Sequence, residues 1–264
     1  RVLWTVPAGE GYSGPAIARG RVYLIDYDAA ARTDVVRCLS LGDGRDIWRL
    51  AYPVDVKRNH GMSRTVPAVV WDAWGGVVVT LGPKCALVAC DAASGKMLWA
   101  KDLVREYGTK VPPWYAGQCP LVVSGPWSVV RGNQSEGGAT VIVAPAGRAV
   151  LMTALDARTG KVVWETPNGW GWSMTHSSVM PVTVDGRRMY VYCGSGGVAG
   201  VDAATGAVLW ETDAWKVSIA TVPSPVDLGE GRLLLSGGYG AGAMIVKLHP
   251  PTASKSEWKV SFER

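Results

Sequence analysis

The segment that decides the fold is Ala154-Leu-Asp-Ala-Arg-Thr-Gly-Lys-Val-Val-Trp164, because related segments recur along the chain. Four such segments end on a tryptophan, and they occupy residues 38–48, 89–99, 154–164 and 200–210. Self-similarity of this kind is the signature of a repeat architecture, in which one supersecondary unit is stacked several times. The repeat therefore has to be interpreted before any single residue.

Each column of the repeat has a physical reason. The glycine four residues before the tryptophan supplies the positive φ of a hairpin turn. The polar residue eight positions before caps that turn through backbone N–H groups, and the residue ten positions before is small, which leaves space for a packed neighbour. The tryptophan offers a flat apolar face to the next unit. The columns contain Trp48, Trp99, Trp164 and Trp210; Ser40, Asp91, Asp156 and Asp202; and Gly44, Gly95, Gly160 and Gly206.

The front half of each unit repeats as well. A proline opens a strand, a turn glycine follows in four of the five units, and an apolar run comes next. The prolines are Pro15, Pro67, Pro120, Pro181 and Pro225. Each unit is therefore predicted to hold four short strands. The third unit is lengthened by an insertion at 125–138, and the fifth carries 250–256 where the Asp-Gly turn would stand.

The string A-x-D-A-x-T-G-K-x-x-W, complete in residues 154–164, resembles the PQQ-like β-propeller repeat. That repeat is found in quinoprotein alcohol dehydrogenases and in BamB-like outer-membrane assembly lipoproteins. The resemblance covers nearly the whole chain and implies an all-β fold, a propeller of four-stranded antiparallel blades. We expect blades at 12–50, 65–101, 118–166, 178–212 and 221–261. The repeat is specific for the fold and says little about function.

Residues 1–6 match the closing strand of a blade, with Trp4 in the tryptophan column. They are expected to belong to a preceding blade, which gives five blades plus one extra strand. Because family members often have eight blades, this pattern favours an arc of a larger propeller. The alternative is a closed ring of five or six blades with an irregular seam.

Composition excludes some partners. The formal net charge is +5, but the basic residues are scattered, whereas nucleic-acid binding needs a clustered basic face. No apolar stretch reaches the roughly 18 residues that a membrane span needs. The chain begins at Arg1 without a signal-like segment, which indicates a mature chain or a fragment. The five cysteines form no C-x-x-C pair and are interpreted as small core residues.

The connections between successive blades are the candidate functional segments, predicted at 51–66, 101–119, 165–179 and 211–222. They should gather on one face around the central channel, and long loops on a rigid scaffold are where binding residues concentrate. Aromatic rings beside cationic and amide groups suit a sugar, a quinone or a peptide, although the same rings could pack the loops together. The candidate ligand-binding residues are His60, Arg64, Trp114, Tyr115, Gln118, Trp170, Trp172, His176, Trp215 and Lys216.

No catalytic or metal-binding constellation emerges from the sequence. Residues 9–14 fit G-x-G-x-x-G, but a proline and a strand follow, and not the helix that a dinucleotide site requires. His60 and His176 do not stand at metal-ligand spacing, and no acidic cluster joins them. Whether the chain is an enzyme stays open, and the residues favour a protein without catalytic activity.

The predicted function is therefore a non-catalytic binding or scaffolding module. The resemblance implies work outside the cytoplasm, in the periplasm or the extracellular space, with an unknown protein, small-molecule or glycan partner. One alternative is a fragment of a PQQ-dependent dehydrogenase, which in that family uses PQQ, calcium, a catalytic aspartate and adjacent cysteines; none of these residues can be matched here. The other is a carbohydrate-binding or carbohydrate-processing propeller, which rests on Trp114, Trp170, Trp172 and Trp215.

Overall fold

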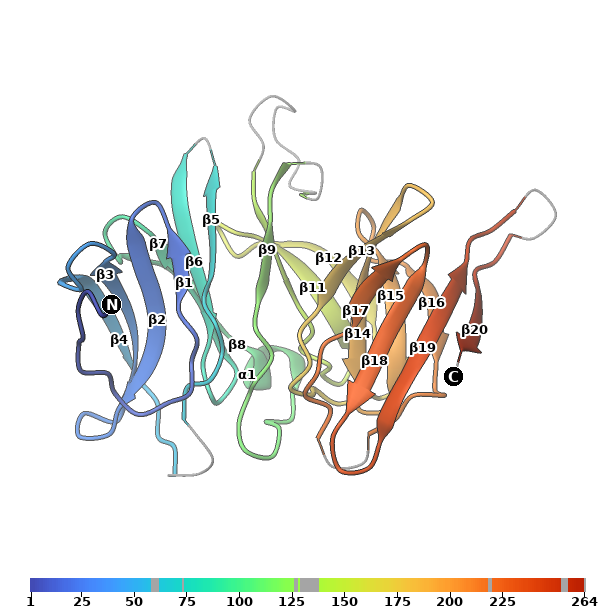
Figure 1. Cartoon of the computed structure of the whole chain (residues 1–264), viewed down its shortest axis with the longest axis horizontal. Coiled ribbons are helices and arrows are strands. Elements are labelled where there is room, and N and C mark those ends of the chain that lie inside the picture. The colour runs from blue at the N-terminus through green and yellow to red at the C-terminus, as the bar shows by residue number, and fades with distance from the viewer. Residues whose placement is uncertain are drawn as a thin grey trace.

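A computed structural model shows five four-stranded antiparallel sheets that follow one another along the chain (Figure 1). The structure describes residues 1–57, 62–72, 74–125, 128, 138–217, 220–252 and 256–263. Within each sheet the strands pair in sequence order, as in a propeller blade. The all-β propeller architecture predicted from the repeat is confirmed. The first and fifth sheets stand at opposite ends of the array, which is therefore open and not the closed five-bladed ring.

The strands have the following bounds. The first sheet holds β1 (Ala16–Ala18), β2 (Arg21–Asp28), β3 (Thr33–Ser40) and β4 (Asp46–Pro53), and the second holds β5 (Ala68–Asp72), β6 (Gly75–Leu81), β7 (Ala86–Asp91) and β8 (Met97–Asp102). A short helix, α1 (Leu103–Tyr107), precedes the third sheet, β9 (Leu121–Val123), β10 (Thr140–Val143), β11 (Val150–Asp156) and β12 (Val162–Pro167). The fourth sheet holds β13 (Met180–Val184), β14 (Arg187–Gly194), β15 (Gly197–Asp202) and β16 (Val208–Thr212), and the fifth holds β17 (Val226–Gly229), β18 (Arg232–Gly237), β19 (Gly242–His249) and β20 (Lys259–Glu263).

A closing tryptophan packs on the turn glycine of the following sheet. The ring of Trp48 lies so close to Gly95 that a Cβ on that glycine would come within 2.6 Å of it. The φ of Gly95 is 74°, so glycine is required there both by the turn and by the neighbouring ring. The same relation joins Trp99 to Gly160 and Trp164 to Gly206.

Hydrogen bonds complete these junctions. The indole N–H of Trp48 donates to the carbonyl of Ala92 at 3.1 Å, just after the capping aspartate of the next sheet. Within the turn, Oδ1 of Asp156 accepts from the backbone N–H groups of Arg158 and Thr159 at 2.9 and 2.8 Å. Asp91 and Asp202 make the equivalent bonds in their turns. The repeated residues therefore fix each turn and fasten it to the preceding sheet.

The small column lies directly across the strand pair from the tryptophan. Ala154 pairs with Trp164 in the register of β11 and β12, so the two side chains point to the same face of the sheet. The same register pairs Cys38 with Trp48, Ala89 with Trp99 and Gly200 with Trp210. A small residue here leaves the indole room to lie flat.

The junction between the fourth and fifth sheets is built differently. The fifth sheet carries residues 250–256 in place of the Asp-Gly turn, so it offers no turn glycine to Trp210. The Trp210 indole instead packs on Gly200 of its own sheet, and its N–H points to the sulfur of Met189 at 3.2 Å. An apolar layer that includes Val191, Leu233 and Val246 holds these two sheets together.

Residues 1–6 are not paired as a strand, but Trp4 docks like the other closing tryptophans. A Cβ on Gly44 would come within 2.6 Å of the Trp4 ring, and the Trp4 indole N–H donates to the carbonyl of Leu41 at 2.9 Å. These are the contacts that Trp48 makes with Gly95 and Ala92. The segment therefore presents its tryptophan to the first sheet as a preceding blade would.

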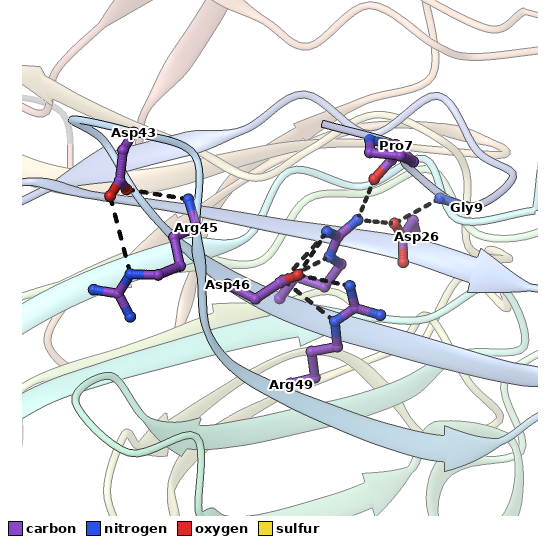
Figure 2. A network of polar contacts seen from close by, with 8 residues as sticks. Pro7, Gly9, Asp26, Asp43, Arg45, Asp46 and Arg49 are labelled. Carbon is purple, nitrogen blue, oxygen red and sulfur yellow. Dashed lines mark hydrogen bonds and ion pairs between the residues drawn. The ribbon is translucent and has the colours of Figure 1, made fainter. Parts of the chain in front are cut away.

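Figure 2 shows how residues 7–9 are fixed to the first sheet by a buried charged network. The guanidinium of Arg37 donates to the carbonyl of Pro7 at 2.8 Å and to the carboxylate of Asp26 at 3.1 Å. Asp26 also accepts from the N–H of Gly9 at 2.8 Å, and Asp46 pairs with Arg37 from the other side. Because the Arg37 and Asp26 side chains are nearly inaccessible, each charge depends on these partners.

The described residues contain no helix with the length and apolar character needed to cross a membrane. All five cysteines are free thiols, and four of them are buried as expected. Cys119 is the partly exposed one.

We expect Trp164→Ala to lower the free energy of unfolding by about 3–5 kcal/mol, because it removes a large buried ring from a sheet junction. Trp74→Ala is the matched control, since half of the Trp74 side chain is exposed (50%), and it should cost far less. Urea denaturation followed by circular dichroism measures both. Similar losses in the two variants would contradict the docking role of Trp164.

Gly160→Ala and Gly186→Ala separate the two reasons for a turn glycine. Both glycines have positive φ, 67° and 73°, and alanine in that region costs about 1–2 kcal/mol. A Cβ at Gly160 would lie 2.8 Å from the Trp99 ring, whereas one at Gly186 meets nothing within 4 Å. Gly160→Ala should therefore cost about 1–3 kcal/mol more than Gly186→Ala by urea denaturation. Equal costs would mean that the turn alone requires glycine.

Candidate functional site

Four of the predicted site residues, contributed by three different blade-to-blade connections, lie side by side. A Cβ on Gly117 would lie 2.8 Å from Cδ2 of His176 and 3.3 Å from Cδ of Arg64, which places both side chains against the same glycine. The ring of Trp114 has its centroid 6.3 Å from that of His176, and Tyr115 follows Trp114 in the chain. We call Arg64, Trp114, Tyr115 and His176 the loop-face cluster.

The two aromatic residues of the cluster sit on a strained turn. Trp114 and Tyr115 have φ values of 63° and 70°, and each bulky residue in this region costs about 1–2 kcal/mol. The turn follows two prolines, and the N–H of Tyr115 donates to the carbonyl of Pro112 at 3.0 Å. Strain of this kind persists only where the surroundings fix it, and it concentrates at functional sites.

Contacts from a second connection fix the Tyr115 ring. Its hydroxyl accepts from the N–H of Lys57 at 2.9 Å and donates to the carbonyl of Lys57 at 2.8 Å. The next residue, Ala116, donates its N–H to the carbonyl of Pro83 at 2.9 Å. The strained turn is thus held by the connection before the second sheet and by the β6–β7 turn.

His176 and Arg64 influence each other electrostatically. Nε2 of His176 lies 3.0 Å from the carbonyl oxygen of Pro113, and because a carbonyl only accepts, this nitrogen carries the proton. Burial lowers the pKa of His176 below 6.5, and the neighbouring Arg64 charge lowers it further. Burial also lowers the pKa of Arg64. At neutral pH the cluster therefore combines a neutral imidazole, a guanidinium and two aromatic rings.

A chain of hydrogen bonds ties the connections to one another where the inner strands begin. The N–H of Val66 donates to Sγ of Cys119 at 3.2 Å, and the N–H of Cys119 donates to Oγ of Ser178 at 2.9 Å. The N–H of Ser178 then donates to Oγ of Ser224 at 2.9 Å. We call Cys119, Ser178 and Ser224 the inner-rim ladder. It joins the chain segments that lead into the second, third, fourth and fifth sheets.

The sequence does not predict the inner-rim ladder. Cys119 fits the pattern of a small core residue, and the two serines belong to no recognisable motif. A signal was nevertheless present, because small polar side chains stand just before the first strand of three successive units.

Besides His176, which is itself buried at 8% exposure, three predicted site residues lie inside the molecule. Gln118 is fully buried, and its side-chain amide exchanges two hydrogen bonds with the backbone of Ala144 at 3.1 and 2.8 Å. The Trp172 ring is buried against Gly194, Gly196 and Gly197. Trp215 is buried in the apolar layer between the fourth and fifth sheets. These side chains pack the loops against the sheets.

The remaining predicted residues have contacts of their own. Trp170 stacks on Trp172 with ring centroids 4.7 Å apart and remains 37% exposed. Lys216 is exposed and pairs with Asp213 at 3.0 Å. His60 lies outside the described residues. The site that the structure assembles is therefore smaller than the predicted set.

The lowered pKa of His176 predicts an acid-sensitive stability. As pH falls below 6.5, the unfolded chain takes up a proton at this position before the folded protein does, so the free energy of unfolding decreases with falling pH until the folded-state pKa is passed. His176→Gln cannot titrate and should lose this decrease. Urea denaturation of both proteins between pH 7.5 and 5.5 measures the difference, in which contributions of other groups cancel. Parallel pH profiles would contradict the assignment.

Comparisons with known proteins agree with this architecture. The family model described as outer membrane protein assembly factor BamB matches residues 1–111 and 31–259. The dehydrogenase subunit of the quinone alcohol dehydrogenase of Gluconobacter oxydans is 28% identical over 80% of this chain and 25% of its own length. The chain thus spans about a quarter of that relative.

Two solved structures resemble this one in fold. BamB from Moraxella catarrhalis superimposes with a TM-score of 0.58 at 17% identity, over 92% of this chain and 60% of that protein. A europium-containing methanol dehydrogenase gives a TM-score of 0.55 at 14% identity, over 95% of this chain and 56% of that one. Identities this low show the fold alone. Because the family model spans most of the sequence, the chain belongs to the BamB-like family of PQQ-repeat β-propellers.

Proposed function

We propose that this chain is a non-catalytic binding module that works outside the cytoplasm and recognises a protein partner through the loop-face cluster. The observation that carries the proposal is the convergence of three connections on one site, with Trp114 and Tyr115 held in a costly backbone conformation. The BamB family, named for outer membrane protein assembly, supports a protein partner and a periplasmic location.

The chemistry of the cluster suits a protein surface. Tyrosine, tryptophan and arginine are the residues that most often anchor protein interfaces. Tyr12 adds a ring that is 74% exposed, and its N–H donates to the carbonyl of Ser63, the residue before Arg64. A guanidinium in a cluster that also contains aromatic rings favours a segment that brings carboxylates or backbone carbonyls.

A quinoprotein dehydrogenase is the second candidate, because of the 28% identity to the Gluconobacter enzyme subunit. The residues present do not fit the full cofactor set. No three or more His, Cys, Asp or Glu side chains in the described part of the chain are grouped to hold a metal ion such as calcium, and the sequence has no adjacent cysteines. We therefore derive no reaction step through PQQ for these residues.

A carbohydrate ligand is the third candidate, but fewer exposed tryptophan rings support it than the sequence predicts. Of the four tryptophans that favoured it, Trp172 and Trp215 are buried. Trp114 and Trp170 are the rings that keep exposed surface, and Trp170 is stacked on Trp172.

Differential scanning fluorimetry distinguishes these candidates. The probes are peptides that copy strands of outer-membrane β-barrel proteins, PQQ with calcium, and a glycan panel. We expect saturable stabilisation by peptides, with affinity reduced about tenfold or more in Arg64→Ala and Trp114→Ala, the size expected for interface anchors. Lys216→Ala, an exposed cation outside the cluster, should bind like the parent protein.

Other outcomes point elsewhere. Stabilisation by PQQ with calcium, accompanied by an absorbance change and dye reduction, would favour the dehydrogenase. Stabilisation by a glycan that Trp170→Ala abolishes would favour the carbohydrate ligand. Peptide binding that is unaffected by both cluster variants would remove the loop-face cluster from the proposal.

A further inference from the structure

Asp34 is a buried carboxylate beneath the connection that carries Arg64. It stands on β3 with no exposed surface. Its Oδ2 accepts from the hydroxyl of Tyr52 at 3.0 Å, and its Oδ1 accepts from the hydroxyl of Ser63. Both of these hydroxyl groups are neutral. A buried carboxylate held by neutral groups costs several kcal/mol of stability, so a contribution to stability does not explain this residue.

The segment that Asp34 contacts is held on three sides. Met62, Ser63 and Thr65 are buried. The Thr65 hydroxyl donates to the carbonyl of Leu81 in the second sheet at 2.7 Å. The Ser63 carbonyl accepts the N–H of Tyr12 at 2.8 Å. Asp34 provides a side-chain hydrogen bond from the first sheet to Ser63, and Met62 shares a buried apolar cluster with Tyr27 of β2.

These contacts of Ser63 and Thr65 fix the backbone position of Arg64. It lies between Ser63 and Thr65, and unlike both of them it keeps partial exposure. Its side chain reaches the Gly117 backbone beside His176, which belongs to the connection after the third sheet. A small displacement of Ser63 would therefore move the guanidinium relative to His176 and Trp114.

We infer that Asp34 is a positioning residue of the loop-face cluster: through Ser63 it sets where the Arg64 guanidinium lies against His176, without itself contacting a ligand. The inference rests on the proposed function of the cluster. It explains a costly buried carboxylate as a geometric anchor, since an ionised oxygen is a stronger hydrogen-bond acceptor than a neutral one.

The surroundings of Asp34 make its anchor sensitive to acid. The pKa of Asp34 is raised to about 6, mainly by burial and to a smaller extent by the neighbouring Asp26, although the hydrogen bonds from Ser63 and Tyr52 lower it. Gly82 of the second sheet packs on the same carboxylate. Protonation turns one acceptor oxygen into a donor and so weakens its hold on the Ser63 hydroxyl.

The test is the pKa of His176 measured by NMR in protein variants without any ligand. Arg64 lowers this pKa, so Asp34→Ala and Ser63→Ala should each raise it by about half a pH unit or more as the guanidinium moves away. Asp34→Asn keeps an acceptor oxygen, but a neutral and weaker one, and should raise the pKa of His176 less than Asp34→Ala does. Tyr52→Phe removes the other hydrogen bond to the same carboxylate and should have little effect. His176→Gln assigns the resonance.

The direction of the change excludes a direct charge effect. Removing the Asp34 charge alone would lower the pKa of a nearby histidine, whereas moving Arg64 away raises it. An unchanged or lowered pKa of His176 in folded Ser63→Ala, the variant that leaves the Asp34 carboxylate in place, would overturn the inference.

Peptide affinity separates this inference from the proposed function. If peptides bind the parent protein, and Asp34→Ala and Ser63→Ala weaken binding more than Asp34→Asn does, the positioning role is supported at the site. If no peptide binds but the pKa of His176 still moves as expected, the positioning role stands and the proposed partner is wrong. Binding that is unchanged in both alanine variants would overturn the positioning role.

Discussion

The contact between a tryptophan of one sheet and a turn glycine of the next is the interaction on which the rest of the structure depends. It needs three residues at once: the tryptophan, a glycine in the next sheet, and a small residue opposite the indole in its own sheet. Only glycine fits the second position, because a Cβ there would come within 2.6–2.8 Å of the indole. Each blade therefore supplies the tryptophan that packs on the turn glycine of the next blade. The contact recurs at each junction from Trp4–Gly44 to Trp164–Gly206. It places successive sheets side by side, and three of the connections between blades meet at the loop-face cluster.

Much of this could be predicted from the sequence, because the constraint is periodic. The Asp, Gly and Trp columns each depend on local geometry, and local geometry leaves a repeated pattern. The close contact between the indole and the glycine, which leaves no room for a Cβ, could not be predicted in that way. A turn with positive φ accounts for Gly95 by itself, so nothing in the sequence indicates that Trp48 imposes a second requirement on it.

The candidate site was less predictable because it is made of residues that occur once. Arg64, Trp114 and His176 belong to connections that differ in length and share no register, so their proximity follows only from the assembled sheets. Composition alone did not separate a ring that faces solvent from one that fills a gap. The sequence predicts a ligand platform at Trp172, whereas its ring packs on three glycines of β14, β15 and their turn. The contact between Asp34 and Ser63 leaves no sequence pattern because the two residues lie 29 positions apart.

The Trp210 indole packs within its own sheet, and this has a consequence for the order in which the sheets unfold. Where an indole of one sheet is docked on the next, opening the seam breaks a specific contact as well as an apolar layer. Between the fourth and fifth sheets the apolar layer acts without that contact. Local opening follows the least stable cooperative unit, so we expect the fifth sheet to open first to amide exchange and to proteases, while the four docked sheets stay together.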